Sequence, residues 1–158
     1  MVLGEYGRIV IGYQGIGKST LSFHNNRVID LESSNFFVDG VRPKYWYIMY
    51  YNIARSLYKQ GYVVCLSSHK EVRDWFTLNP VGNQVIVYPS HELKEQWIKK
   101  LRNRFEQTQS MKDFKAFRNA EDCFDENITD LENQPGFEKI CFDSMGYDLS
   151  DLLKLNVR

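Results

Sequence analysis

Short apolar runs alternate with longer amphipathic stretches along the whole chain. Five runs rich in β-branched or aromatic residues have the length of buried strands, and they cover residues 8–11, 27–30, 62–66, 84–88 and 139–142. The segments between and after them predict helices over 19–23, 45–60, 71–77, 93–107, 111–131 and 149–155, with the stretch 111–131 forming one helix or two. Strands that alternate with helices predict an α/β fold with a parallel sheet and helices on both of its faces.

Two of the predicted helices have clear periodic or terminal signals. In the helix over 45–60, Met49, Ile53 and Leu57 recur at helical spacing, and Gly61 is a suitable C-terminal cap. The helix over 93–107 follows Ser90, which we predict as an N-cap. Its apolar stripe consists of Leu93, Trp97, Leu101 and Phe105.

The residues that follow the strands are the first place to search for a ligand site, because ligands of parallel sheets bind beyond the carboxyl ends of the strands. The first such segment has the pattern GxxxxGK[ST], formed by Gly12, Tyr13, Gln14, Gly15, Ile16, Gly17, Lys18 and Ser19. Glycines in this pattern let the backbone curl so that successive N–H groups face phosphate oxygens. We predict that all of these residues, with Thr20, bind a nucleotide.

Each polar residue of the loop has a predicted task. Lys18 would reach the β and γ phosphates, the Ser19 hydroxyl would take one position on Mg²⁺, and Thr20 would contact the α phosphate. A glycine-rich turn formed for packing alone is the alternative. The position of the pattern directly after a buried strand and before a helix favours phosphate binding.

With these elements and this loop, the chain resembles the nucleotide-kinase branch of P-loop proteins, which includes adenylate, guanylate and shikimate kinases. It also resembles small P-loop proteins carried by phages. The resemblance implies a three-layer P-loop NTPase fold with a five-stranded parallel sheet, in one domain over 1–158 with a helical lid at about 91–134. It further implies ATP or GTP and Mg²⁺ as ligands. The element order supports it along nearly the whole chain, but only the phosphate loop is specific as sequence.

The resemblance also implies catalytic roles beyond Lys18. In these kinases an acid near the end of strand two contacts the acceptor or the magnesium waters, and Asp30 occupies that position. Arginines on a helix after strand four hold the transferring phosphate, and Arg102 and Arg104 match them. We therefore predict Lys18, Asp30, Arg102 and Arg104 as catalytic residues, and Ser19 and Asp30 as magnesium ligands.

The chain departs from the family at the end of strand three. Many P-loop kinases have an Asp there that orders magnesium, whereas residues 63–69 contain no acid. Either Asp30 or Glu32 takes this role through water, or the metal is held more weakly.

Other residues near the strand ends have two interpretations each. Arg42 and Arg73 could hold an anionic group of an acceptor or could be solvated surface residues. His69 could contact substrate or have no catalytic part, and residues 144–147 correspond to the loop that lies against the base in the family. Four aromatic residues could stack on a nucleobase or pack the helix onto the sheet, namely Trp46, Tyr47, Tyr50 and Tyr51.

Charge and composition narrow the set of partners. The formal net charge is zero, which argues against a broad basic face for nucleic acid. The charge is nevertheless segregated, since residues 92–118 hold eight Lys or Arg and four acids, and residues 121–132 hold six acids and no base. The three dispersed cysteines predict reduced thiols and a cytoplasmic protein, and no apolar run has the roughly 18 residues of a membrane span.

These observations together predict an ATP-binding phosphotransferase that acts on a small acceptor, such as a nucleoside or a nucleotide. Two alternatives stay open. One is a nucleotide-binding switch or interaction module without kinase activity, in which residues 92–118 display a partner surface. The other is a nucleic-acid end kinase with a local basic groove.

Overall fold

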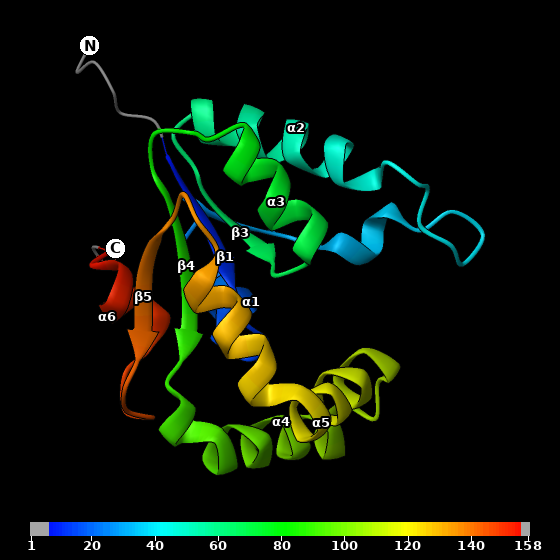
Figure 1. The fold of residues 1–158 in the computed structure, drawn as a ribbon, viewed down its shortest axis with the longest axis vertical. Coiled ribbons are helices and arrows are strands. Elements are labelled where there is room, and N and C mark those ends of the chain that lie inside the picture. Colours follow the sequence, from blue (N-terminus) through cyan, green and yellow to red (C-terminus); the bar gives the residue numbers. More distant parts are fainter. Residues whose placement is uncertain (1–6, 156–158) are drawn as a thin grey trace.

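The computed structural model describes residues 7–155, which form a five-stranded sheet flanked by helices (Figure 1). The strands are β1 (Arg8–Gly12), β2 (Val28–Leu31), β3 (Val63–Ser67), β4 (Gln84–Pro89) and β5 (Glu138–Phe142). Every neighbouring pair is parallel, in the order β2-β3-β1-β4-β5. The five predicted strands are confirmed, and their bounds shift by at most one residue at either end.

The connections between these strands produce three layers. The helices are α1 (Lys18–His24), α2 (Trp46–Lys59), α3 (Lys70–Leu78), α4 (Lys94–Thr108), α5 (Met111–Asn133) and α6 (Leu149–Leu153), with short 3₁₀ turns η1 (Ser33–Phe36) and η2 (His91–Leu93). The crossover from β1 to β2 runs in the opposite direction along the sheet from the other three. Because such crossovers are right-handed, α1 covers one face, and α2, α3 and α5 cover the other. The predicted α/β class with helices on both faces is therefore confirmed.

The face of α2 that packs on the sheet is not the face of its aliphatic stripe. Met49 and Ile53 are 60% and 40% exposed, whereas the helix buries Trp46, Tyr50 and Tyr51. These rings are large, and the tyrosine hydroxyls find partners inside: Tyr50 donates to the Leu31 carbonyl, and Tyr51 donates to the Asn79 carbonyl. Aromatic side chains with satisfied hydroxyls bury more area than Met or Ile and so determine the orientation of the helix.

Two helices extend the fold beyond the carboxyl ends of the strands. α4 and α5 lie side by side there (Figure 1). Ser90 is an N-cap, but of η2 and not of the long helix itself: its hydroxyl accepts from the Glu92 N–H, and α4 begins after Leu93 without a side-chain cap. α5 is two helices joined at Cys123, whose φ of −138° is not helical. Beyond this kink Phe124, Ile128 and Leu131 are buried. Within residues 7–155, no helix combines the length and the apolar composition needed to cross a membrane.

Candidate active site

The loop between β1 and α1 needs glycine at two positions. Gly15 and Gly17 have φ angles of 85° and 102°, in the left-handed region that side chains disfavour. A Cβ atom on Gly15 would also lie 3.0 Å from the Leu101 side chain of α4. The backbone curl that the motif predicts is present, and α4 packs directly against it.

The carbonyl groups of this loop point toward α4. The Trp97 indole donates to the Gln14 carbonyl at 2.8 Å, and the Lys100 ammonium donates to the Gly15 carbonyl at 2.6 Å. In a planar trans peptide the next N–H points the opposite way, so the loop amides face away from α4. In the described part of the chain, the N–H groups of Gly15, Gly17, Lys18 and Ser19 donate no hydrogen bond. They form a concave set of free donors of the kind that binds phosphate.

Two residues of the motif serve the core rather than the loop surface. The Tyr13 N–H is already used, because it donates to the Val87 carbonyl at 3.0 Å. Its ring packs edge-to-face on Phe124, and burial raises the pKa of its hydroxyl to about 12. Ile16 is buried as well. Both side chains anchor the loop, and Ile16 also lines the cavity that opens beside it.

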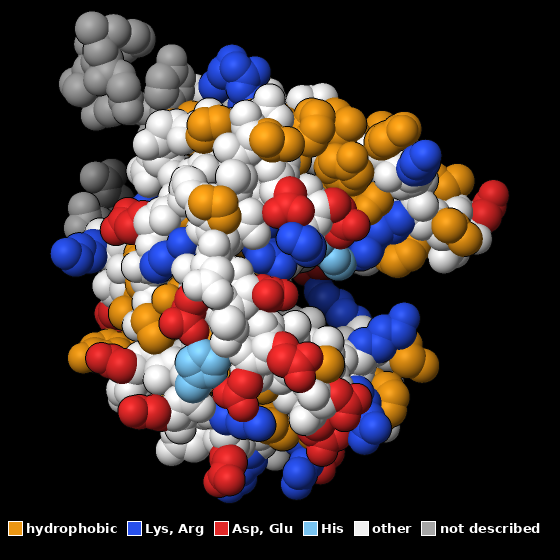
Figure 2. Space-filling model, in the orientation of Figure 1, with side chains coloured by type: hydrophobic (Ala, Val, Ile, Leu, Met, Phe, Trp, Pro, Cys, Tyr) orange, Lys and Arg blue, Asp and Glu red, His pale blue; other side chains and the backbone are white. Residues whose placement is uncertain are grey.

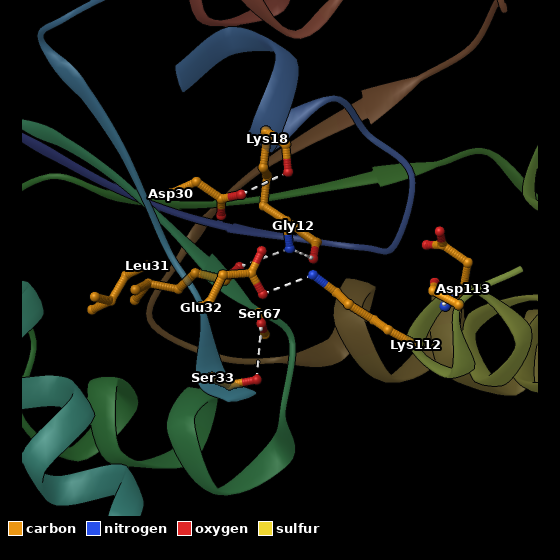
Figure 3. Close-up of polar contacts among 12 residues, drawn as sticks. Gly12, Lys18, Asp30, Leu31, Glu32, Ser33, Ser67, Lys112 and Asp113 are labelled. Carbon is orange, nitrogen blue, oxygen red and sulfur yellow. Dashed lines mark hydrogen bonds and ion pairs between the residues drawn. The ribbon is translucent and has the colours of Figure 1, made fainter. Parts of the chain in front are cut away.

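Lys18 lies at the base of the loop, on its inner side. Its ammonium donates to the Gly12 carbonyl at 3.2 Å and to the Leu66 carbonyl at 3.3 Å (Figure 3). Burial lowers the pKa of Lys18, and the nearby charge of Asp30 opposes that shift. A cation that is held by neutral carbonyl groups and not by an ion pair keeps its charge available for a phosphate.

Asp30 and Ser19 meet at the mouth of the loop. The Ser19 hydroxyl donates to the Asp30 carboxylate at 2.8 Å, and the Ser19 residue is exposed. A hydroxyl and a carboxylate oxygen in contact are the hard ligands that Mg²⁺ prefers, so the residues present fit this ion. The described residues contain no group of three or more His, Cys, Asp or Glu side chains placed to hold a metal. Thr20, the next residue of α1, is also exposed.

Glu32, the second candidate acid, forms an ion pair with a lysine of α5. The Lys112 ammonium lies 2.7 Å from the Glu32 carboxylate, and Figure 3 shows this side chain reaching toward Lys18. The charge of Lys112 contributes to lowering the pKa of Lys18. A basic residue of the helical extension therefore enters the centre of the candidate site.

Arg102 and Arg104 lie further out on α4. Both are exposed, Arg104 pairs with Asp113 at 3.1 Å, and the Arg102 guanidinium lies over the Phe117 ring. Both therefore contact side chains of α5 and not the phosphate loop. Their predicted role in catalysis stays a prediction that requires the helices to move.

Arg73 has a structural explanation. It is 6% exposed, and its guanidinium donates to the Ser68 carbonyl at 3.0 Å and to the Gln134 side chain at 2.7 Å. These bonds join α3 to the end of α5. Its proximity to the sheet edge is thus a consequence of packing, and the interpretation as a solvated surface arginine is wrong.

Lys100 and Lys112 are site residues that the sequence interpretation missed. Lys100 follows Trp97 by three positions, so helical spacing alone places it beside a buried residue, and this signal could have been used. Lys112 has no such signal. Its contact with Glu32 joins residues 80 positions apart and depends on the path of two helices.

A cavity of about 350 Å³ opens beside the loop on the side of α1 and α6. Apolar walls come from Leu21, Trp97 and Phe142. Met145 and Tyr147, in the segment predicted to lie against a base, also line the cavity, together with Asp148. Its position next to Gly17 and Thr20 suits the base and sugar of a nucleotide whose phosphates enter the loop.

Comparisons with known proteins show the fold. No family model matches the chain, and no curated protein sequence matches it. Among solved structures, the crystal structure of a gluconokinase from Sinorhizobium meliloti 1021 is similar, with a TM-score of 0.50 and 14% sequence identity. The similarity covers 94% of this chain and 87% of the gluconokinase chain. The chain therefore has a three-layer α/β fold with a five-stranded parallel sheet, similar to the fold of this gluconokinase.

Proposed function

We propose that this chain is a P-loop phosphotransferase that moves the terminal phosphate of ATP, or of GTP, to a small acceptor such as a nucleoside or a nucleotide. One observation carries the proposal. The loop over 12–20 presents free backbone donors, and beside them lie the Lys18 ammonium and the Ser19–Asp30 pair at 2.8 Å. A concave set of donors next to a cation and two hard oxygen ligands is suited to a triphosphate with its magnesium.

Each part of the site has its own role in the proposed reaction. The loop amides bind the phosphates, the adjoining cavity takes the base, and Lys18 offsets the charge that accumulates on the transferring group. Ser19 and Asp30 hold Mg²⁺, which when bound offsets negative charge on the β and γ phosphates. In the reaction, the bond from the terminal phosphorus to the ADP oxygen breaks and a bond to an acceptor oxygen forms. Where that oxygen is a hydroxyl, Asp30 would orient it or receive its proton, and where the acceptor is a monophosphate, Asp30 would serve the magnesium waters.

The helical extension acts as a lid in this proposal. We place the mobile part before the kink at Cys123, because the later half of α5 is buried in the core. Lys112, Arg102 and Arg104 lie in that part, and they supply positive charge when the lid closes over bound phosphates. The base of α4 stays fixed, since Trp97 and Lys100 bond to the loop itself.

A nucleotide-dependent switch is the second candidate function. β3 ends in Ser67 and is followed by Ser68 and His69, so no acid stands where many P-loop kinases order magnesium. The Lys112–Glu32 ion pair also joins the lid to the core, and a bound nucleotide would compete for Lys112. Binding without transfer would follow if the metal were held too weakly for catalysis.

Incubation with γ-labelled ATP, Mg²⁺ and a panel of acceptors separates these functions. The panel contains nucleosides, nucleoside monophosphates, gluconate, and oligonucleotides with free ends. We expect label in one small-molecule class and none with Lys18→Ala. Label only in oligonucleotides would support an end kinase, and ATP binding without any transfer would support the switch. Failure of the wild-type chain to bind ATP would contradict both the kinase and the switch.

A further inference from the structure

Arg42 is a cation without a carboxylate partner beside the candidate site. It lies between η1 and α2, where its guanidinium stacks on the Phe37 and Trp46 rings at 4.6 Å from each ring centroid. Among the ion pairs of residues 7–155, none involves Arg42. Two aromatic rings hold the group in place and leave its charge uncompensated.

The hydrogen bonds of this guanidinium are also incomplete. Its Nη2 donates to the Ser33 hydroxyl at 3.1 Å, whereas its Nε is buried and has no hydrogen-bond partner. A buried N–H without an acceptor is unfavourable, and folded proteins retain one mainly where a ligand or water completes it. An arginine offers a planar fork that matches two oxygens of a phosphate or a carboxylate.

The groups that contact Arg42 and Ser33 carry no negative charge, and the nearest acid of the cluster is the half-exposed Glu71, 3.9 Å from the His69 ring. The Ser33 hydroxyl lies 3.1 Å from the His69 imidazole and 3.3 Å from the Ser67 hydroxyl. Burial, followed by the charges of Arg42, Lys18 and Arg73, lowers the pKa of His69 to about 4, so its ring is neutral at pH 7. The charges that shift the pKa of His69 are thus all positive, although Glu71 lies 3.9 Å from its ring. Two hydroxyls and a neutral imidazole can adjust as donors to an incoming anion.

Two residues of this cluster follow residues that contact Lys18 or belong to the candidate site. Ser67 ends β3 directly after Leu66, whose carbonyl binds the Lys18 ammonium, and Ser33 follows Glu32. The cavity suited to the base lies against α1 and α6, and its lining includes no residue of this cluster. Figure 2 shows the molecule hollowed between its α2–α3 end and its α4–α5 end, with Lys and Arg side chains around the hollow.

We propose that Arg42, Ser33 and His69 bind an oxyanion of the acceptor, either a phosphate monoester or a carboxylate. This inference rests on the proposed phosphotransferase function and narrows its acceptor from any small molecule to an anionic one. A nucleoside monophosphate or a sugar acid meets the requirement. A nucleoside or a neutral sugar leaves the Arg42 charge and its Nε uncompensated.

The test compares matched pairs of acceptors that differ only in the anionic group. The chain is first saturated with a non-hydrolysable ATP analogue and Mg²⁺, which occupies the phosphate loop, and binding is then measured by calorimetry. The pairs are each nucleoside monophosphate with its nucleoside, and gluconate with glucose. We expect measurable binding only for charged members, and a change of the His69 ring signals in NMR spectra when they bind. The class of the charged member that binds distinguishes phosphate from carboxylate.

Three variants assign that selectivity to Arg42. Arg42→Gln removes the charge and should raise the dissociation constant, or KM in the transfer assay, by about tenfold or more while affinity for the ATP analogue is unchanged. Arg42→Lys keeps the charge without the fork and should recover only part of the affinity. Lys44→Gln, which removes an exposed charge two residues away, should behave as the wild type.

Several results would overturn the inference. One is a neutral acceptor that binds as well as its charged partner, and another is equal behaviour of Arg42→Gln and Lys44→Gln. A third is the absence of binding by every charged probe while the ATP analogue is bound. If Arg42→Gln fails to fold, binding of the matched acceptor pairs to the wild type still tests the inference. Loss of ATP binding by the wild type would instead refute the proposed function, so the two failures are distinguishable.

Discussion

Asp30 and Ser19 come from different elements, yet their side-chain oxygens are 2.8 Å apart at the mouth of the phosphate loop. The phosphate-loop pattern predicts Ser19 as a magnesium ligand, and the resemblance to nucleotide kinases implies Asp30. The structure brings the two side chains together because Asp30 lies near the end of β2 and Ser19 at the start of α1, and their binding of magnesium stays a prediction. Glu32, the other candidate acid, is paired with Lys112 instead. At the scale of single residues, Asp30 is therefore the acid best placed to complete a magnesium site.

Asp30→Asn, which keeps the size of the side chain and removes its charge, tests this role. We expect lower Mg²⁺-dependent activity and a several-fold higher Mg²⁺ concentration at half-maximal rate, because an amide is a weaker ligand for Mg²⁺ than a carboxylate. Titration of the transfer rate against Mg²⁺ measures both quantities. Asp122→Asn, at an exposed position of α5, is the matched control.

The outcome also separates two roles of Asp30. A lower rate with an unchanged Mg²⁺ requirement would assign Asp30 to the acceptor. If neither quantity changes relative to Asp122→Asn, Asp30 has no catalytic part, and Glu32→Gln is the next variant to measure.

The two helices α4 and α5, which we propose as a lid, illustrate what periodicity predicts and what it leaves open. The predicted stripe of Leu93, Trp97, Leu101 and Phe105 matches the buried face of α4 at Trp97 and Leu101. Leu93 is also buried but lies in η2, and Phe105 is only partly buried. The stripe cannot say that this face covers the phosphate loop, because that depends on where β4 ends relative to β1. The same limit explains why Arg102 and Arg104 were chosen for the site and Lys112 was not.

Three substitutions in the lid compare these cations. We expect Lys112→Ala, Arg102→Ala and Arg104→Ala each to lower turnover more than they weaken ATP binding in the absence of acceptor, because lid contacts form mainly in the closed state. The largest loss, about tenfold or more, should belong to Lys112→Ala, which alone of the three contacts a residue at the sheet edge. Turnover and ATP affinity are measured separately. Equal losses in both quantities for all three variants would contradict a lid.

His91 joins η2 to the buried half of α5 and should make stability depend on pH. Its ring lies 2.8 Å from Asp125 and 2.6 Å from Glu132, and the hydrogen bond with Asp125 is the largest cause that raises its pKa. A histidine whose pKa is raised in the folded state stabilises the fold. This stabilisation is fully present below the unfolded pKa of about 6.5, and it disappears as the pH rises through the folded pKa.

His91→Gln should therefore lower the Tm at pH 6 and leave it nearly unchanged at pH 9. The difference should be only a few degrees, because these side chains are partly exposed and solvent screens their interaction. Thermal unfolding at both pH values measures it, with His24→Gln as a control for removal of an exposed histidine. The same decrease at pH 6 and at pH 9 would show that the ring acts by packing and not by charge.

At the scale of the whole molecule, the sheet brings polar and charged side chains of distant segments together at the carboxyl ends of its strands. The alternation of strands and helices and the glycine pattern were enough to predict the class of fold, the five strands and the curled glycine-rich loop between β1 and α1. The residues of the proposed acceptor site were harder to predict from the sequence. Ser33, Arg42 and His69 belong to a 3₁₀ turn, a loop and the start of a helix, and they meet only because β2 and β3 are neighbours. Their contacts depend on strand order, which periodicity does not encode.

The central claim is that the loop over 12–20 transfers the terminal phosphate of a nucleotide. The most direct test compares transfer of labelled γ-phosphate by the wild type and by Lys18→Ala, with Lys99→Ala as an exposed lysine control on α4. We predict that Lys18→Ala loses more than about tenfold in turnover while its Tm stays close to that of the wild type, because Lys18 provides charge and fills no core position. Lys99→Ala should turn over normally. Wild-type turnover by Lys18→Ala would contradict the account.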